Sequence, residues 1–214
     1  MTRGIRISLV SGCVALMGCA SSFPVISQRT YEKADGLFRI VAVVPFATGD
    51  ELPLSLRPGG VAPGEASELV ARFVVEAFQA QSIRVIPASD VERSFVAAGG
   101  QSHLANAQTA ASMVAREFGA TAIVRGEVLR YREREGGARG ARRPASVAFV
   151  MTLYTAPEGR RVWSARFDET QPALSENPLR ARLYPGGGTR WLSAAELARW
   201  GADQALSVIP PSIR

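Results

Sequence analysis

The chain has 214 residues and a mass of 22.8 kDa; 47% of its residues are hydrophobic and 21% are charged. This composition excludes a mainly disordered chain, and 20 glycines without a regular period exclude a collagen-like one. The formal net charge is +6, and Lys33 is the single lysine, so arginine supplies the other 24 of the 25 basic residues. One histidine and two cysteines leave little material for metal or acid–base chemistry.

The first 18 residues have the layout of a secretory signal peptide. Arg3 and Arg6 form a short positive region, and an apolar stretch follows over residues 7–16. The next segment, Leu16-Met17-Gly18-Cys19, resembles the lipobox of bacterial lipoproteins, in which the cysteine is acylated and becomes the first residue of the mature chain. Cleavage before Cys19 removes Arg3 and Arg6 from the net charge of +6, which leaves +4.

Two other interpretations of this end of the chain stay open. Val10-Ser11-Gly12-Cys13 is a competing lipobox, but only three residues of apolar core precede it. A plain secretory signal is the second alternative, although it prefers an Ala-x-Ala triplet, and none is present. We therefore predict lipidation at Cys19. Ala20 after the cysteine resembles the sorting context for the outer membrane, which implies a lipid-anchored protein facing the periplasm.

Four regions are expected along the chain. Residues 1–18 form the signal peptide, and residues 19–38 form the lipidated cysteine and a flexible tether, because residues 20–37 show no sustained apolar period. Eighteen flexible residues reach about 20–25 Å. Residues 39–169 are expected to form an α/β domain, and residues 170–214 an irregular segment followed by a helix that packs on the same domain.

Strands and helices alternate in the predicted domain. Strands are expected over residues 39–46, 82–87, 120–132, 147–155 and 160–169, with loops over 48–64 and 133–144. Helices are expected from about residue 65 to 81, over 89–98 and 104–118, and from Ser193 to the Pro210-Pro211 stop. Ser89 with Glu92, and Ser193 with Glu196, match capping boxes, and Gly119 fits a helix C-terminus. The order β-α-β-α-α-β-β-β-α predicts an α/β fold with a mixed sheet and helices packed on it in two or three layers.

Three segments of this pattern carry a resemblance. They are Val41-Ala42-Val43-Val44-Pro45-Phe46 before an amphipathic helix, Ile83-Arg84-Val85-Ile86, and the stretch from Gly119 to Val128. Together they resemble a group of bacterial envelope proteins: curli-secretion-channel lipoproteins, penicillin-binding-protein-activator lipoproteins and the N-terminal domain of the Tol-system translocation protein. These proteins share a "VAVLPF" first strand and a "GADAVVxGxV" strand, and the resemblance covers residues 39–167. The tail after residue 167 is more similar to small uncharacterised envelope lipoproteins.

Candidate catalytic groups are few. His103 has no partner carboxylate, thiolate or second histidine nearby in sequence, so neither a metal site nor a catalytic role is predicted for it. Asp168 and Glu169 are adjacent on a strand, so their side chains should point to opposite faces rather than form a glycosidase pair. The Gly186-Gly187-Gly188-Thr189 segment lacks the lysine of a phosphate loop. No catalytic residue, cofactor or metal is therefore predicted.

An arginine excess is the one electrostatic anomaly. Between residues 125 and 143 seven arginines stand against three glutamates. Guanidinium groups bind phosphate and carboxylate in a bidentate manner, so this stretch is a candidate contact surface for an acidic partner in the envelope. The alternative is a solvated loop. The candidate contact residues are Arg130, Arg132, Arg134, Arg139, Arg142 and Arg143.

The leading hypothesis is a non-enzymatic lipoprotein, attached to the membrane through its N-terminal lipid, that acts as a tethered adaptor or accessory factor for another envelope protein. Neither nucleic acid nor a small-molecule substrate is expected. Two alternatives stay open. One is a subunit of an oligomeric outer-membrane secretion pore, which would need residues 147–155 and 160–169 as membrane strands. The other is a hydrolase of envelope polymers that uses His103, Asp168 or Glu169.

Overall fold

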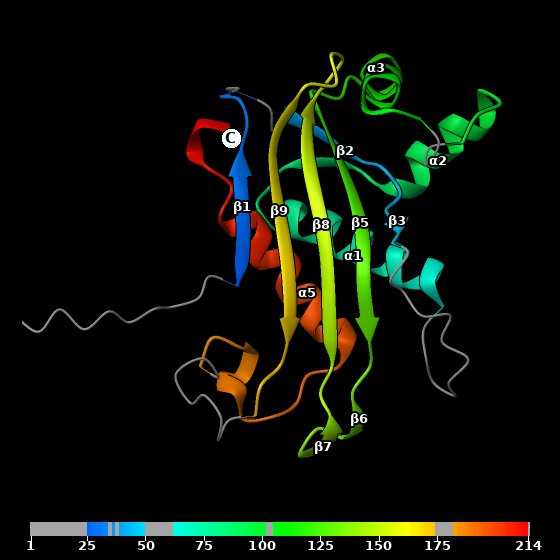
Figure 1. The fold of residues 1–214 in the computed structure, drawn as a ribbon. Coiled ribbons are helices and arrows are strands. Elements are labelled where there is room, and N and C mark those ends of the chain that lie inside the picture. Colours follow the sequence, from blue (N-terminus) through cyan, green and yellow to red (C-terminus); the bar gives the residue numbers. More distant parts are fainter. Residues whose placement is uncertain are drawn as a thin grey trace, which may run out of the picture.

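The computed structural model describes residues 25–33, 36, 39–49, 62–101, 105–173 and 182–213. Its centre is a seven-stranded mixed sheet in the order β1-β9-β8-β5-β2-β4, with β3 paired to β5 (Figure 1). The predicted fold class is confirmed.

The strands are β1 (Ile26–Thr30), β2 (Ile40–Val43), β3 (Ala47–Thr48), β4 (Arg84–Ile86), β5 (Ala122–Arg132), β8 (Ser146–Thr155) and β9 (Arg161–Thr170), and a separate hairpin is made of β6 (Glu135–Gly137) and β7 (Gly140–Arg143). The helices are α1 (Pro63–Ala80), α2 (Ala88–Ala97), α3 (Ala107–Phe118) and α5 (Ala194–Ser207), with short 3-10 helices at Pro185–Gly188 and Pro211–Ile213.

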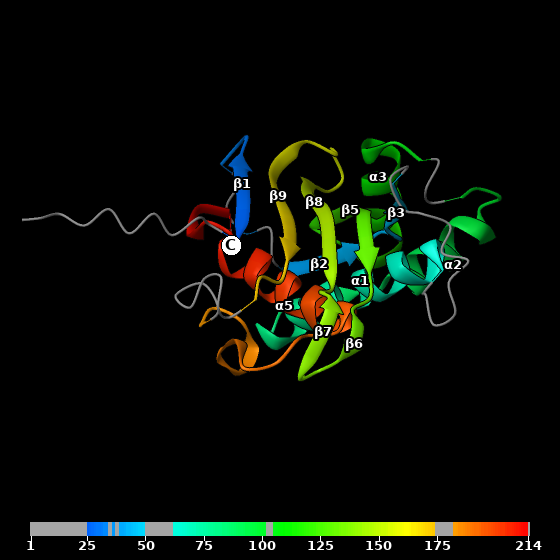
Figure 2. The ribbon, with the colours of Figure 1, turned by 60° about the horizontal axis from the view of Figure 1, so that its bottom comes forward.

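The helices cover the sheet unequally. Helices α1 and α5 pack along one face and bury the larger hydrophobic core, whereas α2 and α3 lie on the other face over β2, β4, the start of β5 and the end of β8 (Figures 1 and 2). No described helix covers the rest of that second face, which is made of β1, β9, most of β8 and the later part of β5. We call it the open face. None of the described helices is both long enough and apolar enough to cross a membrane.

Strand β9 shows why one face is open. Trp163, Ala165 and Phe167 are buried, whereas Arg166 and Asp168, at the alternate positions, are exposed. Because successive side chains of a strand point to opposite faces, the apolar set packs under α5 and the polar set lines the open face. Strand β8 follows the same rule, with Phe149 and the other core residues on the α5 side.

Strand β1 corrects the expected tether. Residues 26–30 pair antiparallel with β9, with Ile26 opposite Phe167, and the Ile26 side chain is only 6% exposed. The Trp163 side chain donates a hydrogen bond from Nε1 to Gln28 Oε1 at 2.9 Å. The prediction of a flexible segment up to residue 38 is therefore wrong for these residues. It failed because β1 contributes one buried apolar side chain and takes its partner from a strand far along the sequence.

The β6–β7 hairpin corrects a second expectation. Residues 133–144 were expected to form a loop, but Glu135 pairs with Arg143 and Gly137 with Gly140 in an antiparallel ladder. The pattern gave no sign of it, because these strands are short, polar and glycine-rich and bury no apolar face. The hairpin continues the path of β5 and β8 beyond the end of the main sheet (Figures 1 and 2).

Helix ends agree with the sequence in two of three places. Ser193 and Glu196 form the predicted capping box of α5, and Gly119 ends α3 in the left-handed region with φ of 66°. The predicted box at Ser89 is wrong: α2 begins one residue earlier, after Pro87, and Ser89 donates to the Asp90 carboxylate instead. A proline before the helix already sets the extended entry, which leaves Ser89 inside the first turn.

Two glycines permit close packing. A Cβ on Gly126 would come within 2.2 Å of the Phe46 ring, so the aromatic residue that ends the "VAVVPF" segment lies directly on β5. A Cβ on Gly201 would come within 2.8 Å of the Phe167 ring, so α5 approaches β9 closely at this point. Each glycine therefore permits an aromatic ring to pack directly against the backbone.

Candidate functional site: arginines on the open face

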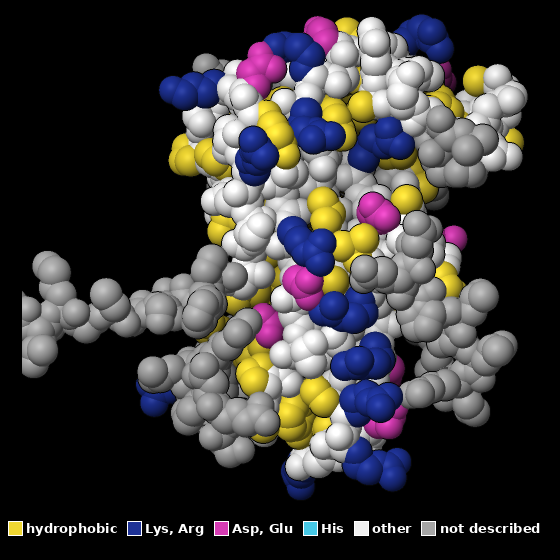
Figure 3. Space-filling model, in the orientation of Figure 1, with side chains coloured by type: hydrophobic (Ala, Val, Ile, Leu, Met, Phe, Trp, Pro, Cys, Tyr) yellow, Lys and Arg dark blue, Asp and Glu magenta, His cyan; other side chains and the backbone are white. Residues whose placement is uncertain are grey.

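The upper part of the open face in the view of Figure 1, where β5 begins and β8 ends, carries a cluster of arginine and tyrosine side chains. The pairing register places Arg29 opposite Ser164, Ser164 opposite Thr152, and Thr152 opposite Arg125, so these four residues cross four strands in one row. The next row holds Tyr31, Arg161 and Tyr154. Figure 3 shows arginine side chains among hydrophobic ones in this part of the face. We call Arg29, Tyr31, Arg125, Tyr154 and Arg161 the tyrosine–arginine patch.

Stacking orders the patch. The Arg29 and Arg161 guanidinium carbons lie 5.1 Å and 5.2 Å from the centre of the Tyr31 ring, and Arg161 lies 5.9 Å from the centre of the Tyr154 ring. Such cation–π contacts contribute about 0.5–1 kcal/mol each at exposed sites. Ser164 donates to the Tyr31 hydroxyl at 3.4 Å, and the hydrogen bonds from Ser164 and Arg161 lower the pKa of Tyr31. The two guanidinium groups are thus positioned before any ligand arrives.

The arginines of the patch keep their charge available. Within the described residues, neither Arg29, Arg125 nor Arg161 forms an ion pair with a carboxylate, and Tyr31 is 42% exposed. Glu127, two positions after Arg125 on the same strand, faces the same side of the sheet. The patch therefore carries unpaired positive charge beside two aromatic rings, which suits an anionic ligand.

The lower part of the open face is different, because Asp168 occupies its arginines. Both Arg130 and Arg166 donate to the Asp168 carboxylate, Arg166 at 2.7 Å. Partial burial raises the pKa of Asp168, but the hydrogen bonds from Arg166 and Arg130 outweigh burial and the pKa is lowered. The single carboxylate balances one of the two guanidinium charges, and it holds both groups within the domain.

The structure divides the six predicted contact residues. Four of them interact with other groups. Arg130 forms an ion pair with Asp168, and Arg143 forms one with Glu135 at 3.0 Å. Arg134 donates a hydrogen bond to the Trp191 carbonyl at 2.7 Å, and Arg132 is also engaged. The other two, Arg139 and Arg142, are exposed on the hairpin and form no ion pair with any described acidic residue. We call these two the hairpin arginines. Figure 3 shows basic side chains (dark blue) that run down the right side of the lower half of this face toward the hairpin.

The other predicted residues do not form a catalytic set. Asp168 is exposed on the open face, whereas Glu169 is buried on the opposite side, where it accepts a hydrogen bond from the Tyr184 hydroxyl at 2.8 Å. Their divergence is as predicted. Cys19 and His103 lie outside the described residues. Among the described residues no group of three His, Cys, Asp or Glu side chains could hold a metal ion.

The glycine segment at 186–188 forms a turn, and Trp200 belongs to the hydrophobic core. Gly186 and Gly187 belong to a 3-10 turn, with φ of 75° and 67°, and do not join a strand directly to a helix. Trp200 packs in the core with its ring centre 4.8 Å from that of Tyr184. The segments that a pore would need as membrane strands form β8 and β9, with α5 packed on them.

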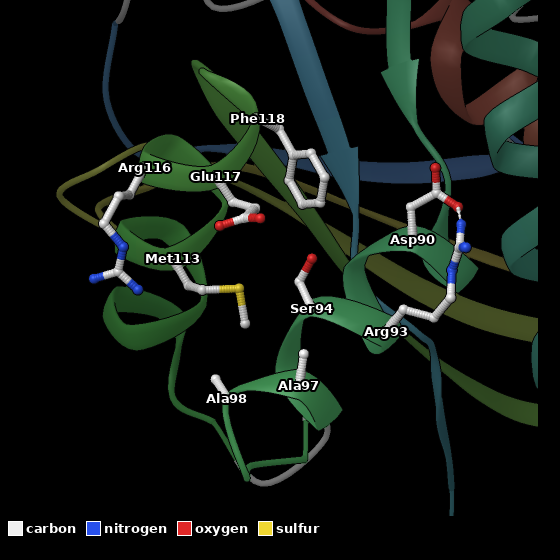
Figure 4. A pocket seen from close by; sticks show the side chains of 9 residues that line it. All are labelled: Asp90, Arg93, Ser94, Ala97, Ala98, Met113, Arg116, Glu117 and Phe118. Carbon is white, nitrogen blue, oxygen red and sulfur yellow. Dashed lines mark hydrogen bonds and ion pairs between the residues drawn. The ribbon is translucent and has the colours of Figure 1, made fainter.

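A shallow cavity of about 490 Å³ lies between α2 and α3 (Figure 4). Met113 and Phe118 from α3 face Ser94 and Ala97 from α2. At its edge Arg93 and Asp90 form an ion pair at 2.6 Å, so these charges already satisfy each other. The cavity brings together no acid–base pair or cluster of metal ligands.

Sequence reasoning missed the tyrosine–arginine patch. Its members lie between positions 29 and 161, and only the strand register brings them together. Alternation on β9 was visible in the sequence, but the position of β1 beside it was not. Without β1, neither Arg29 nor Tyr31 could be assigned to this face.

No protein-family model matches the chain, and no curated protein matches it. Solved structures are similar at low identity. A PelC dodecamer from Paraburkholderia phytofirmans is 19% identical, with 88% of this chain and 97% of that chain covered and a TM-score of 0.46. Lipoprotein GNA1162 from Neisseria meningitidis is 20% identical, over 61% and 83% of the two chains with a TM-score of 0.41. The LpoB C-terminal domain from Escherichia coli is 17% identical, over 64% and 88% with a TM-score of 0.39.

Proposed function

We propose that this protein is a lipoprotein of the bacterial cell envelope, attached through acylated Cys19 to the outer membrane with its domain in the periplasm. It acts as a non-enzymatic accessory factor that binds an acidic surface of another envelope protein. The observation that carries this proposal is the β6–β7 hairpin, which projects beyond the sheet and presents Arg139 and Arg142 without ion-pair partners among the described residues.

The hairpin is held both at its base, through Arg134, and at its turn, through Ala138, which lies between β6 and β7. The Trp191 backbone N–H donates to the Ala138 carbonyl at 2.8 Å, and the Arg134 side chain donates to the Trp191 carbonyl at 2.7 Å. The ion pair between Arg143 and Glu135 links its two strands. A preorganised arm loses little conformational entropy on binding, which favours its use as a contact element.

Arginine suits the proposed contact. Its guanidinium group binds a carboxylate through two parallel hydrogen bonds, and arginine is enriched among the residues that dominate protein–protein binding energy. Two exposed guanidinium groups at the end of an ordered arm therefore favour an acidic surface on a partner protein. The four arginines that have partners within the domain support the arm or the sheet instead.

The proposal is tested by crosslinking in cells. A photoreactive residue at Ala141 is combined with Arg139→Glu/Arg142→Glu or, as a control with the same charge change, with Arg84→Glu/Arg116→Glu, two exposed arginines on β4 and α3. We expect the hairpin variant to lower crosslinking to an envelope protein at least fivefold, and the control to keep it within twofold of the parent. Equal crosslinking in both variants would overturn the proposal.

A further inference from the structure

We propose that the tyrosine–arginine patch docks the domain onto anionic phospholipid headgroups of the membrane that holds its lipid. This inference rests on the proposed lipidation of Cys19 and concerns a different surface from the hairpin arginines. The patch and the hairpin lie toward opposite ends of β5 and β8 (Figure 1), so a domain docked through the first leaves the second available to a partner.

The length of the chain between Cys19 and the sheet limits where the domain can lie. Strand β1 begins at Ile26, only seven positions after the cysteine. Seven residues span at most about 25 Å when fully extended, and about 13–16 Å on average as a flexible chain. The domain is therefore confined to the layer next to the headgroups. The eighteen-residue tether expected from the sequence would have allowed much greater freedom.

The same strand carries Arg29 of the patch, and Tyr31 directly follows its last residue. Arg29 and Tyr31 lie three and five positions after the start of β1, and each residue of a strand advances about 3.4 Å. Arg29 and Tyr31 are thus the members of the patch that lie nearest to Cys19 along the chain, ten and twelve positions after it. Arg161 and Tyr154 lie beside them on β9 and β8.

The chemistry of the patch matches a phospholipid surface. Guanidinium groups bind phosphate, and tyrosine is enriched at membrane–water interfaces because its ring is apolar and its hydroxyl is polar. Each arginine near an anionic membrane raises binding by roughly fivefold at physiological salt, so three together raise it about a hundredfold. The lower arginines of the open face add less, because Asp168 occupies Arg130 and Arg166.

The test is co-sedimentation of the mature chain carrying Cys19→Ala, so that no acyl chain contributes. The vesicles contain equal parts of phosphatidylglycerol and phosphatidylcholine, or phosphatidylcholine alone. The patch variant is Arg29→Gln/Arg125→Gln/Arg161→Gln, and the control with the same charge change is Arg116→Gln/Arg139→Gln/Arg142→Gln. Unfolding midpoints are measured for both variants, and Tyr31→Ala serves as a second patch variant that changes no charge.

We expect the patch variant to bind anionic vesicles at least thirtyfold more weakly than the parent and the control to lose less than threefold. Binding to phosphatidylcholine alone should be weak for all, and Tyr31→Ala should lower anionic-vesicle binding severalfold. Equal losses in the two triple variants would overturn the inference, because they would indicate net charge alone. Unchanged vesicle binding in the patch variant would overturn it too. The hairpin crosslinking experiment is unaffected by either result, so the two proposals fail separately.

Discussion

The buried indole N–H of Trp163 donates a hydrogen bond to the Gln28 side chain at 2.9 Å and so joins two residues 135 positions apart. The Trp163 side chain has no exposed surface. Together with the pairing of Ile26 to Phe167, this bond makes β1 a part of the folded domain. The distance from the predicted lipid to the domain therefore follows from this strand, as does the position of Tyr31.

Replacement of Gln28 tests how strongly β1 is held. Gln28→Ala removes the acceptor and leaves the buried indole N–H without its partner, which should lower the free energy of unfolding by about 1–3 kcal/mol. Ser27→Ala, at an exposed position on the same strand, is the control and should change the value by less than about 0.5 kcal/mol. Guanidinium-induced unfolding measures both. Equal effects of the two variants would contradict the role assigned to Gln28.

Gly126→Ala tests the contact between Phe46 and β5. The new Cβ would meet the Phe46 ring at 2.2 Å, and overpacking of this kind costs about 1–3 kcal/mol of unfolding free energy. Phe46→Leu removes the ring edge, so the double variant should be less destabilised than the sum of the two single variants, with a coupling of at least about 1 kcal/mol. Additive effects in a double-mutant cycle would show that the ring does not press on this glycine.

Glu196 makes part of the stability depend on pH. Hydrogen bonds from Arg190, and then those from Ser193, outweigh partial burial and hold the pKa of Glu196 at about 2, below its ordinary value of 4.5. Because the folded pKa is the lower one, the stabilisation is present above pH 4.5 and is lost as the pH falls toward 2. The side chain is 41% exposed, so solvent screening limits the contribution to about 1 kcal/mol.

The corresponding variant is Glu196→Gln, compared with the parent by chemical unfolding between pH 6 and pH 2.5. We expect the variant to be less stable by about 1 kcal/mol at pH 6 and the difference to shrink steadily below pH 4.5. A difference that stays constant over the whole range would show that the carboxylate charge is not what stabilises the start of α5.

Much of the fold could be predicted from periodicity. Strand β8 is largely apolar, strand β9 alternates buried and exposed side chains, and α1 repeats its apolar residues at helical spacing. The buried face of each element can therefore be recognised from its own sequence. Strand β1 has almost no such pattern, because Ile26 is its one buried side chain. It becomes a strand only where β9 offers an unpaired edge, and that is a property of the assembled sheet.

The candidate site divides in the same way. The arginine excess between residues 125 and 143 was visible in the sequence, but which of those arginines are free depends on acceptors such as Asp168 and the Trp191 carbonyl. The tyrosine–arginine patch has no local signature, since Arg29, Arg125 and Arg161 meet only through the strand register. Composition could indicate the chemistry of the surface, and only the fold could locate it.

The most direct measurement of the central claim is metabolic labelling with palmitate followed by membrane fractionation of the parent, Cys13→Ala and Cys19→Ala. We expect the parent and Cys13→Ala to carry the label and to sediment with the outer membrane, and Cys19→Ala to lose the label and to leave the membrane pellet in buffer of high salt. Label retained in Cys19→Ala, or a parent chain that keeps Met1 and stays with the soluble fraction, would contradict the account.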